Sequence, residues 1–335
     1  MKRLSAVLFI FFVSRLLLGA DNPDLGKTPL ILALESGHLS ALEMLLRAGA
    51  DPDKEDDDGL LPLVVAMQQQ EAEFMQYLLT YGAAVNKQNK DGWAPLHFAV
   101  RSGVRADAEW LIDRGADVNL GDHDGYSPLH FAVEHQKRDM AELLLDRGAD
   151  VNLGNKDGWA PLHFAVKGQS RDFVEFFLKR GVPVNQLTTG KQFTPLYLAV
   201  NHGLTDKVEL LLQYGADVNL PSRLYGRAPL HAASSWGLNP DLVDRLIQAG
   251  ADIEVKDDYG YTPLFIAISY EQPELVERLL RAGANMYQTD NCGESPLQLA
   301  EKRGNAAIQA LLEKHDRNRQ DRAVESPSAK RRKKI

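Results

Sequence analysis

Nine Pro-Leu dipeptides recur along this chain of 335 residues at intervals of 33 or 34 residues, and no other feature constrains the fold as much. The prolines are Pro29, Pro62, Pro95, Pro128, Pro161, Pro195, Pro229, Pro263 and Pro296. An alanine stands four positions after the proline at all nine sites. A period of about 20–50 residues is typical of stacked units, each too small to bury its own apolar face. The period therefore predicts a single solenoid.

The residues around each proline are repeated as well. Glycine stands three positions before the proline at eight sites, and Gln192 is the exception. Proline has the φ angle of a first helical residue and needs no hydrogen-bond donor there, so a helix is expected to begin at each proline. A second, leucine-rich helix precedes glycines such as Gly115 and Gly148. Glycine favours the left-handed conformation that ends helices, which places the end of the second helix there.

The repeated pattern is similar to the ankyrin repeat. Four Leu-His pairs, beginning at Leu96, Leu129, Leu162 and Leu230, and segments such as Gly-Ala-Asp-Val-Asn carry the resemblance. It implies an all-α-type repeat solenoid of stacked helix-turn-helix units with β-hairpin fingers. It also implies that the histidine stabilises a turn by hydrogen bonds. We place the solenoid at residues 21–316, with nine repeats at about 24–56, 57–89, 90–122, 123–155, 156–189, 190–223, 224–257, 258–290 and 291–316.

The first twenty residues have the three parts of a secretory signal peptide. Lys2 and Arg3 give a positive start, an apolar run covers 4–13, and Leu18-Gly19-Ala20 precedes a polar segment. The apolar run is too short to span a membrane. We therefore expect residues 1–20 to be cleaved and the protein to be exported, to a bacterial-type periplasm. An uncleaved anchor and an unprocessed cytoplasmic chain are the alternatives.

Charge is distributed unevenly along the chain. The net charge is −8 overall, but the leader contributes +3 and residues 317–335 contribute +6, which leaves −17 on the repeats. An acidic body argues against nucleic-acid binding through the repeats and favours a partner with a basic surface. We expect 317–335 to be a disordered basic tail. Its Lys330–Lys334 run resembles a nuclear localisation signal. The compartment that this run indicates differs from the one that the leader indicates.

The sequence contains no recognisable catalytic motif. It has no nucleophile elbow, phosphate loop, paired-histidine zinc motif or CxxC pair, and its single cysteine excludes an intramolecular disulfide. The alternating acids Asp51, Asp53, Glu55 and Asp57 resemble the start of a calcium loop, but Asp56 occupies the position that requires glycine. We therefore predict a protein that is not an enzyme and that has neither a cofactor nor a metal.

Two columns of side chains are candidates for partner binding. Ankyrin solenoids typically bind proteins with their concave side, made of fingers and first helices, and the columns lie two residues before and seven after each proline. Trp and Tyr often dominate interface energy, because they combine a large area with few rotatable bonds. The predicted partner-binding residues are Trp93, Tyr126, Trp159, Phe193, Trp236, Tyr261 and Tyr270.

Two alternatives to a binding role remain open for these rings. Finger aromatics could pack on the adjacent repeat. In addition, residues 89–100 and 155–166 are identical, so Trp159 could be a duplicate of Trp93. A pure binding role predicts that Trp93→Ala with Trp159→Ala leaves thermal stability nearly intact.

Together these features predict an exported, non-catalytic, monomeric binder of one folded protein. Occlusion of the partner is the mechanism open to such a chain, and this suggests an inhibitor of an envelope enzyme or a protector against one. A secreted effector or nuclear adaptor that uses the basic run is one alternative. An intracellular scaffold with an uncleaved leader is another.

Overall fold

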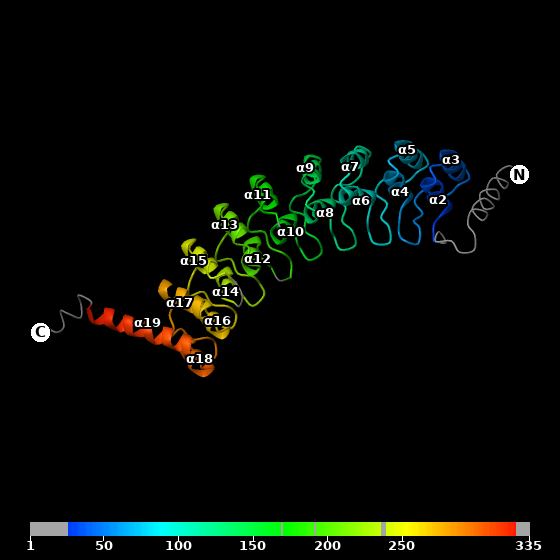
Figure 1. Ribbon diagram of the computed structural model, residues 1–335. Coiled ribbons are helices and arrows are strands. Elements are labelled where there is room, and N and C mark those ends of the chain that lie inside the picture. The colour runs from blue at the N-terminus through cyan, green and yellow to red at the C-terminus, as the bar shows by residue number, and fades with distance from the viewer. Residues whose placement is uncertain (1–25, 169, 191, 236–238, 326–335) are drawn as a thin grey trace. The chain divides into compact units, whose positions relative to one another are not determined.

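The computed structural model describes residues 26–168, 170–190, 192–235 and 239–325. The predicted leader, Trp236 and the Lys330–Lys334 run lie outside these ranges. The described residues form eighteen helices and no strand, in consecutive helix-turn-helix pairs (Figure 1). This confirms the helical repeat solenoid. None of the described helices is long and apolar enough to cross a membrane.

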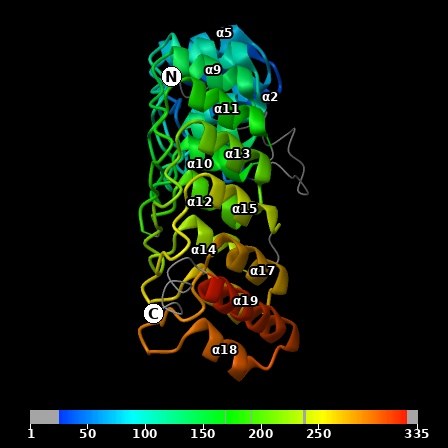
Figure 2. The same cartoon turned by 90° about the vertical axis from the view of Figure 1, so that its left-hand side faces the viewer.

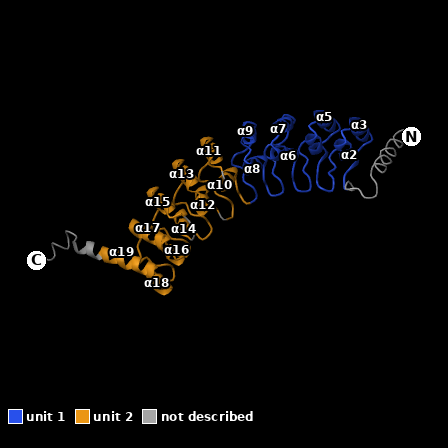
Figure 3. Ribbon diagram, viewed as in Figure 1, with its two compact units in different colours: residues 1–156 blue, residues 157–335 orange. Residues whose placement is uncertain are grey.

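The chain divides into two compact units, residues 1–156 and 157–335 (Figure 3). In each unit the first helix of every repeat lies between its finger and its second helix (Figure 2). The first helices are α2 (Pro29–Glu35), α4 (Pro62–Gln68), α6 (Pro95–Ser102) and α8 (Pro128–Glu134) in the first unit, and α10 (Pro161–Lys167), α12 (Pro195–Asn201), α14 (Pro229–Ala233), α16 (Pro263–Ser269) and α18 (Pro296–Arg303) in the second. The second helices are α3 (Leu39–Arg47), α5 (Ala72–Thr80), α7 (Arg105–Ile112) and α9 (Arg138–Asp146), then α11 (Arg171–Lys179), α13 (Thr205–Gln213), α15 (Asp241–Gln248), α17 (Pro273–Ala282) and α19 (Ala306–Glu325).

The repeated proline is the first residue of every first helix, as the sequence predicts. Two kinds of side chain satisfy free N–H groups at this end, except at α4, where Leu61 precedes the proline and forms no side-chain cap. Where the third helical residue is histidine or glutamine, its side chain accepts the N–H of the residue before the proline, as His97 Nδ1 does from Ala94 at 3.0 Å. At α2, α12 and α16 a threonine caps the helix, as Thr194 does by accepting the N–H of Tyr197 at 2.9 Å. Both are forms of N-terminal helix capping.

The histidines also connect neighbouring repeats. Because Nδ1 of His97 accepts a hydrogen bond, Nε2 carries the proton and donates to the carbonyl of Tyr126 at 3.1 Å. His231 makes the equivalent contact to Tyr261 at 2.9 Å, whereas His163 donates to the carbonyl of Gln186, nine residues before Pro195, at 3.0 Å. Burial lowers the pKa of all three imidazoles, which favours the neutral form that these bonds require. The histidine therefore has the structural role that the resemblance implies.

Within each unit the core is a stack of leucine and alanine side chains. Leu96 and Ala99 of α6 and Leu129 and Ala132 of α8 are between 0 and 1 % exposed. Each burial of a leucine side chain contributes about 2 kcal/mol, and small alanines allow the helices to approach closely. A single repeat has one such layer, so the second face of that layer must be covered by a neighbour.

The fingers are tight turns rather than the expected β-hairpins. In the third repeat the N–H of Asn89 donates to the carbonyl of Trp93 at 3.0 Å, and Gly92 closes the turn at φ +82°. A Cβ at Gly92 would lie 2.4 Å from the nitrogen of His123 in the next finger, which explains the glycine. One such bond per finger is too short a ladder for strand geometry, so the described fingers contain no strand.

An asparagine ladder joins the bases of successive fingers. Asn86 accepts the N–H of Asp117 at 2.8 Å and donates its amide to the carbonyl of Gly115 at 3.0 Å. Asn119 and Asn219 bond in the same way to the repeats that follow them. Each amide thus satisfies one donor and one acceptor at the end of a second helix, where backbone groups would otherwise lack partners.

Glu254 interrupts this ladder in the second unit. It stands at the same register, nine residues before Pro263, and its Oε1 accepts the N–H of Asn285 at 2.7 Å. Its Oε2 is buried without a hydrogen-bond partner, because a carboxylate has no proton to donate to the carbonyl of Gly283. Burial raises the pKa of Glu254, with the nearby charge of Asp252 acting in the same direction and Lys256 opposing it.

We predict that Glu254→Gln stabilises the second unit. The glutamine amide supplies the missing donor, and relief of one unsatisfied buried group is worth about 1 kcal/mol. Because the pKa of Glu254 is higher in the folded state, the wild type loses stability as the pH rises above the pKa of glutamate in the unfolded chain, about 4.3. The gain in unfolding midpoint should therefore be full at pH 7 and shrink toward pH 4. Calorimetry at both values measures it, and an equal or lower midpoint at pH 7 would contradict the ladder.

The C-terminal helix is longer than the sequence analysis predicted. The predicted disordered tail begins at residue 317, whereas α19 continues to Glu325. Ile308 and Leu312 anchor its first half in the core, at 1 and 0 % exposure. No glycine or proline occurs between 305 and 325, and Pro327 is the first residue that cannot continue a helix. A charged composition predicts disorder, but it is also compatible with a helix whose first turns are packed in the core.

Candidate binding surface

The aromatic rings of the fingers lie against the first helices of their own repeats. The ring centroids of Trp93 and Phe98 are 5.3 Å apart, and those of Tyr261 and Phe265 are 4.3 Å apart and nearly parallel. The remaining pairs are Tyr126 with His130, Trp159 with Phe164, and Phe193 with Tyr197, at 5.7, 5.6 and 5.2 Å. All five finger rings are half-buried. The face formed by fingers and first helices, which we call the finger face, is therefore lined by rings held in fixed positions.

Trp93 also contributes to packing between repeats. Its ring lies 4.6 Å from that of Phe131 on α8, edge to face, and the Arg101 guanidinium lies 4.8 Å from its centroid. Edge-to-face pairs of this kind contribute about 1 kcal/mol beyond their buried area. The alternative of packing on the adjacent repeat is thus confirmed for Trp93.

We predict that Trp93→Ala lowers the free energy of unfolding of the first unit by about 2 kcal/mol. Full burial of an aromatic ring is worth about 3–5 kcal/mol, and Trp93 is half-buried. This reverses the expectation of nearly intact stability. Urea unfolding followed by circular dichroism measures the change. Trp93→Phe, which retains a ring against Phe131, serves as the control and should recover most of the loss.

Tyr270 differs from the finger rings because it is largely free. It follows the last residue of α16, as the register seven after the proline predicts, and it is 44 % exposed. His135 and His202 occupy the corresponding place after α8 and α12. The predicted residue Trp236 lies outside the described part of the chain.

Two further exposed tyrosines are not among the predicted binding residues. Tyr225 and Tyr259 stand four residues before the proline, and they are 45 and 48 % exposed. Their rings are 5.7 Å apart, and Tyr259 lies 5.6 Å from Tyr261. The sequence does contain a signal for them, because aspartate occupies this register in the second to fifth repeats and tyrosine replaces it at these two sites. Tyr225 has φ +64°, which is rare for an aromatic residue and marks this finger as irregular.

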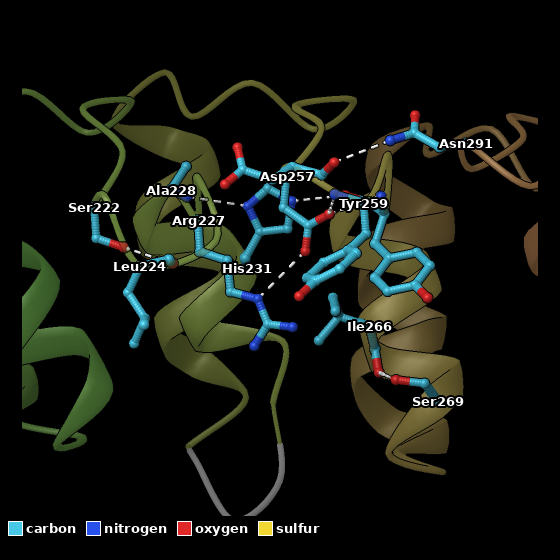
Figure 4. Close-up of polar contacts among 12 residues, drawn as sticks. Ser222, Leu224, Arg227, Ala228, His231, Asp257, Tyr259, Ile266, Ser269 and Asn291 are labelled. Atoms are coloured by element: carbon cyan, nitrogen blue, oxygen red, sulfur yellow. Dashed lines mark hydrogen bonds and ion pairs between the residues drawn. The ribbon is translucent and has the colours of Figure 1, made fainter. Parts of the chain in front are cut away.

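A buried ion pair lies beneath these rings (Figure 4). Asp257 accepts the N–H groups of Tyr259 and Tyr261 at 3.0 and 2.9 Å through Oδ1. Its Oδ2 accepts from Nε of Arg227 at 3.3 Å, and its side chain is 0 % exposed. The Arg227 guanidinium also lies 5.6 Å from the Tyr225 ring. Asp257 therefore fixes both the finger turn and the direction of the arginine.

A groove with a volume of about 580 Å³ opens beside this cluster in the second unit. Its aromatic lining consists of Tyr261, Phe265 and Tyr270. The charged residues described along its walls are Arg227, Lys302, Arg303 and Glu294. Three cations against one acid form a local basic patch on a unit whose repeats, 157–316, hold 20 acidic and 15 basic residues.

The described residues show no side-chain cluster suited to metal binding. They contain no group of three or more His, Cys, Asp or Glu side chains placed to hold a metal. In the calcium-like run, Asp53 accepts the N–H of Ala84 in the next repeat at 3.0 Å, and Asp56 accepts that of Leu60 in its own turn at 2.8 Å, so both carboxylates serve as acceptors for backbone N–H groups. The finger face offers recognition chemistry, namely rings, an oriented guanidinium and hydrogen-bond donors.

Comparisons with known proteins agree with this geometry. The model for ankyrin repeats in three copies matches residues 43–122, 63–155, 129–222, 182–257 and 230–321, and the single-repeat model matches 25–57. The crystal structure of the ankyrin repeat domain of Bcl-3, described as a unique member of the IkappaB protein family, aligns with a TM-score of 0.55 and 29 % identity over 76 % of this chain and 99 % of that domain. No curated protein matches the chain. The family matches cover most of the sequence, and the chain belongs to the ankyrin-repeat family.

Proposed function

We propose that this protein is a non-catalytic scaffold that binds one folded protein through its finger face. The observation that carries the proposal is the set of five half-buried finger rings, each in contact with a ring on the first helix of its own repeat. Such rings lose little conformational freedom on binding, because these contacts already restrict them. The likeness to the Bcl-3 ankyrin domain supports a role in protein–protein interaction.

The first unit is suited to a basic surface of the partner. Residues 21–156 hold 24 acidic and 12 basic side chains, a net charge of −12. Acidic side chains are concentrated at residues 51–58, in the finger of the second repeat. A potential of this sign steers a basic protein toward the finger face and repels acidic competitors.

The composition of residues 1–20 supports export, and we propose that the scaffold acts in the periplasm on an envelope enzyme. The described residues of the finger face are suited to recognition, so in this proposal binding acts by covering the partner's active site, either to inhibit the enzyme or to protect its target. The test is direct. An enzyme saturated with the scaffold should lose activity, and full activity at saturation would contradict inhibition.

Paired baits test the binding face. We expect Trp159→Ala with Tyr270→Ala to lose the partner that the wild-type chain retains, because both rings lie on the finger face. Tyr214→Ala is the matched control: this tyrosine is 38 % exposed but follows the second helix α13. Retention is measured by mass spectrometry of protein captured from native cells. Equal retention by all three baits would place recognition elsewhere.

Export has its own test. N-terminal sequencing of the protein from the periplasmic fraction should begin at Asp21, because Leu18-Gly19-Ala20 precedes the predicted cleavage site. An unprocessed chain confined to the cytoplasm would contradict export. It would favour the intracellular scaffold or the adaptor that uses Lys330–Lys334.

A further inference from the structure

We propose that the groove between Arg227 and Arg303 in the second unit binds an acidic segment of the partner, with a carboxylate on Arg227 and an apolar side chain against the rings. This inference rests on the proposed function and adds to it the chemistry of a second contact. The partner would then present a basic surface to the first unit and an acidic segment to this groove.

Arg227 is held ready for an anion. Its Nε donates to Asp257, and its two terminal nitrogens point away from that carboxylate (Figure 4). Asp257 is itself fixed by two backbone N–H groups at 3.0 and 2.9 Å. A guanidinium positioned through Nε presents a planar pair of donors, which matches the two oxygens of a carboxylate. The buried aspartate thus orients the arginine without occupying its terminal donors.

Arg227 also departs from the repeat pattern in an informative way. It stands two residues before the proline, at the register where the third to sixth and the eighth repeats have aromatic rings. Packing of a finger against its first helix is served by a ring at this register, as Tyr261 and Phe265 show at 4.3 Å. The arginine therefore replaces a packing group with a charged one beside the groove.

The opposite wall adds two further cations. Lys302 and Arg303 lie at the end of α18 and are exposed. Lys302 pairs with Glu294 at 3.3 Å, and it is 74 % exposed in that pair. An exposed ion pair of this kind contributes less than about 1 kcal/mol, so an incoming carboxylate can replace it. A negatively charged ligand in the groove would thus face cationic side chains on both walls.

The floor of the groove is aromatic. Tyr261 and Phe265 are stacked with a 6° angle between their planes, and exposed Tyr270 lies at the rim. Rings that are already stacked offer an apolar surface of fixed shape. A segment that alternates acidic and apolar residues can pair with the cations of the walls and pack on the rings of the floor. A uniform polyanion can pair only with the cations of the walls.

The test uses a short fluorescein-labelled peptide that alternates aspartate and leucine, with an asparagine–leucine peptide as its uncharged counterpart. The full-length protein should bind the acidic peptide at least about tenfold more tightly than the counterpart. Lys302→Glu with Arg303→Glu should abolish this preference. Arg227→Lys should weaken binding about tenfold, because it keeps the charge over Asp257 but loses the planar fork. Fluorescence anisotropy measures all three.

Arg281→Glu is the matched control for charge reversal. Arg281 pairs with Glu277 on the second helix α17 and is 73 % exposed, so the variant should bind as the wild type does. Equal binding of both peptides, or an unchanged preference in the Lys302/Arg303 variant, would overturn the inference. Equal binding of a single-stranded oligonucleotide would also overturn it, by showing a general attraction to anions.

The same variants distinguish this inference from the proposed function. If Trp159→Ala with Tyr270→Ala loses the captured partner while the Lys302/Arg303 variant retains it fully, the scaffold function stands and the acidic contact fails. If the wild-type chain captures no partner under native conditions, the proposed function fails and this deeper inference fails with it. Loss of the partner in both variants supports the inference.

Discussion

Burial of one leucine–alanine layer against the next is the interaction on which each unit depends. A repeat of 33 residues has a single such layer, and its second face stays exposed unless a neighbour covers it. Ala99 and Ala132, both fully buried, show how closely successive first helices approach. Because this requirement is the same for every repeat, it fixes the proline, leucine and alanine registers. Other positions of the repeat are then free to vary.

Polar groups at the repeat ends are satisfied by a second, less uniform set of contacts. The first helices other than α4 are capped by histidine, glutamine or threonine, and amides join several finger bases. The caps are chemically distinct, but each accepts an N–H group at the helix start, which is why Thr194 replaces a histidine cap without disturbing α12. Glu254 is not equivalent, since a carboxylate accepts but does not donate.

The sequence was sufficient to predict every element whose cause is local. Proline marks the start of each first helix, and left-handed glycines such as Gly115 and Gly283 follow the second helices. Two results could not be predicted in this way. Whether Trp93 packs or binds depends on Phe131, 38 residues away, and the extent of α19 depends on how Ile308 and Leu312 are buried. Aromatic residues at one register of the repeat are expected both for packing and for partner binding. The sequence pattern therefore cannot distinguish a structural ring from a binding ring.

Departures from the repeat pattern are therefore more informative about recognition than the pattern itself. Aromatic rings at Trp93 and Tyr261 follow the repeat pattern and pack on their first helices, whereas Arg227, Tyr225 and Tyr259 depart from that pattern. Tyr225 even adopts a backbone conformation that disfavours its side chain. Three such departures lie near one buried carboxylate, Asp257, which holds Arg227 and the turn that carries Tyr259. Stacking alone does not account for this convergence, whereas a demand for specific side chains at this face does.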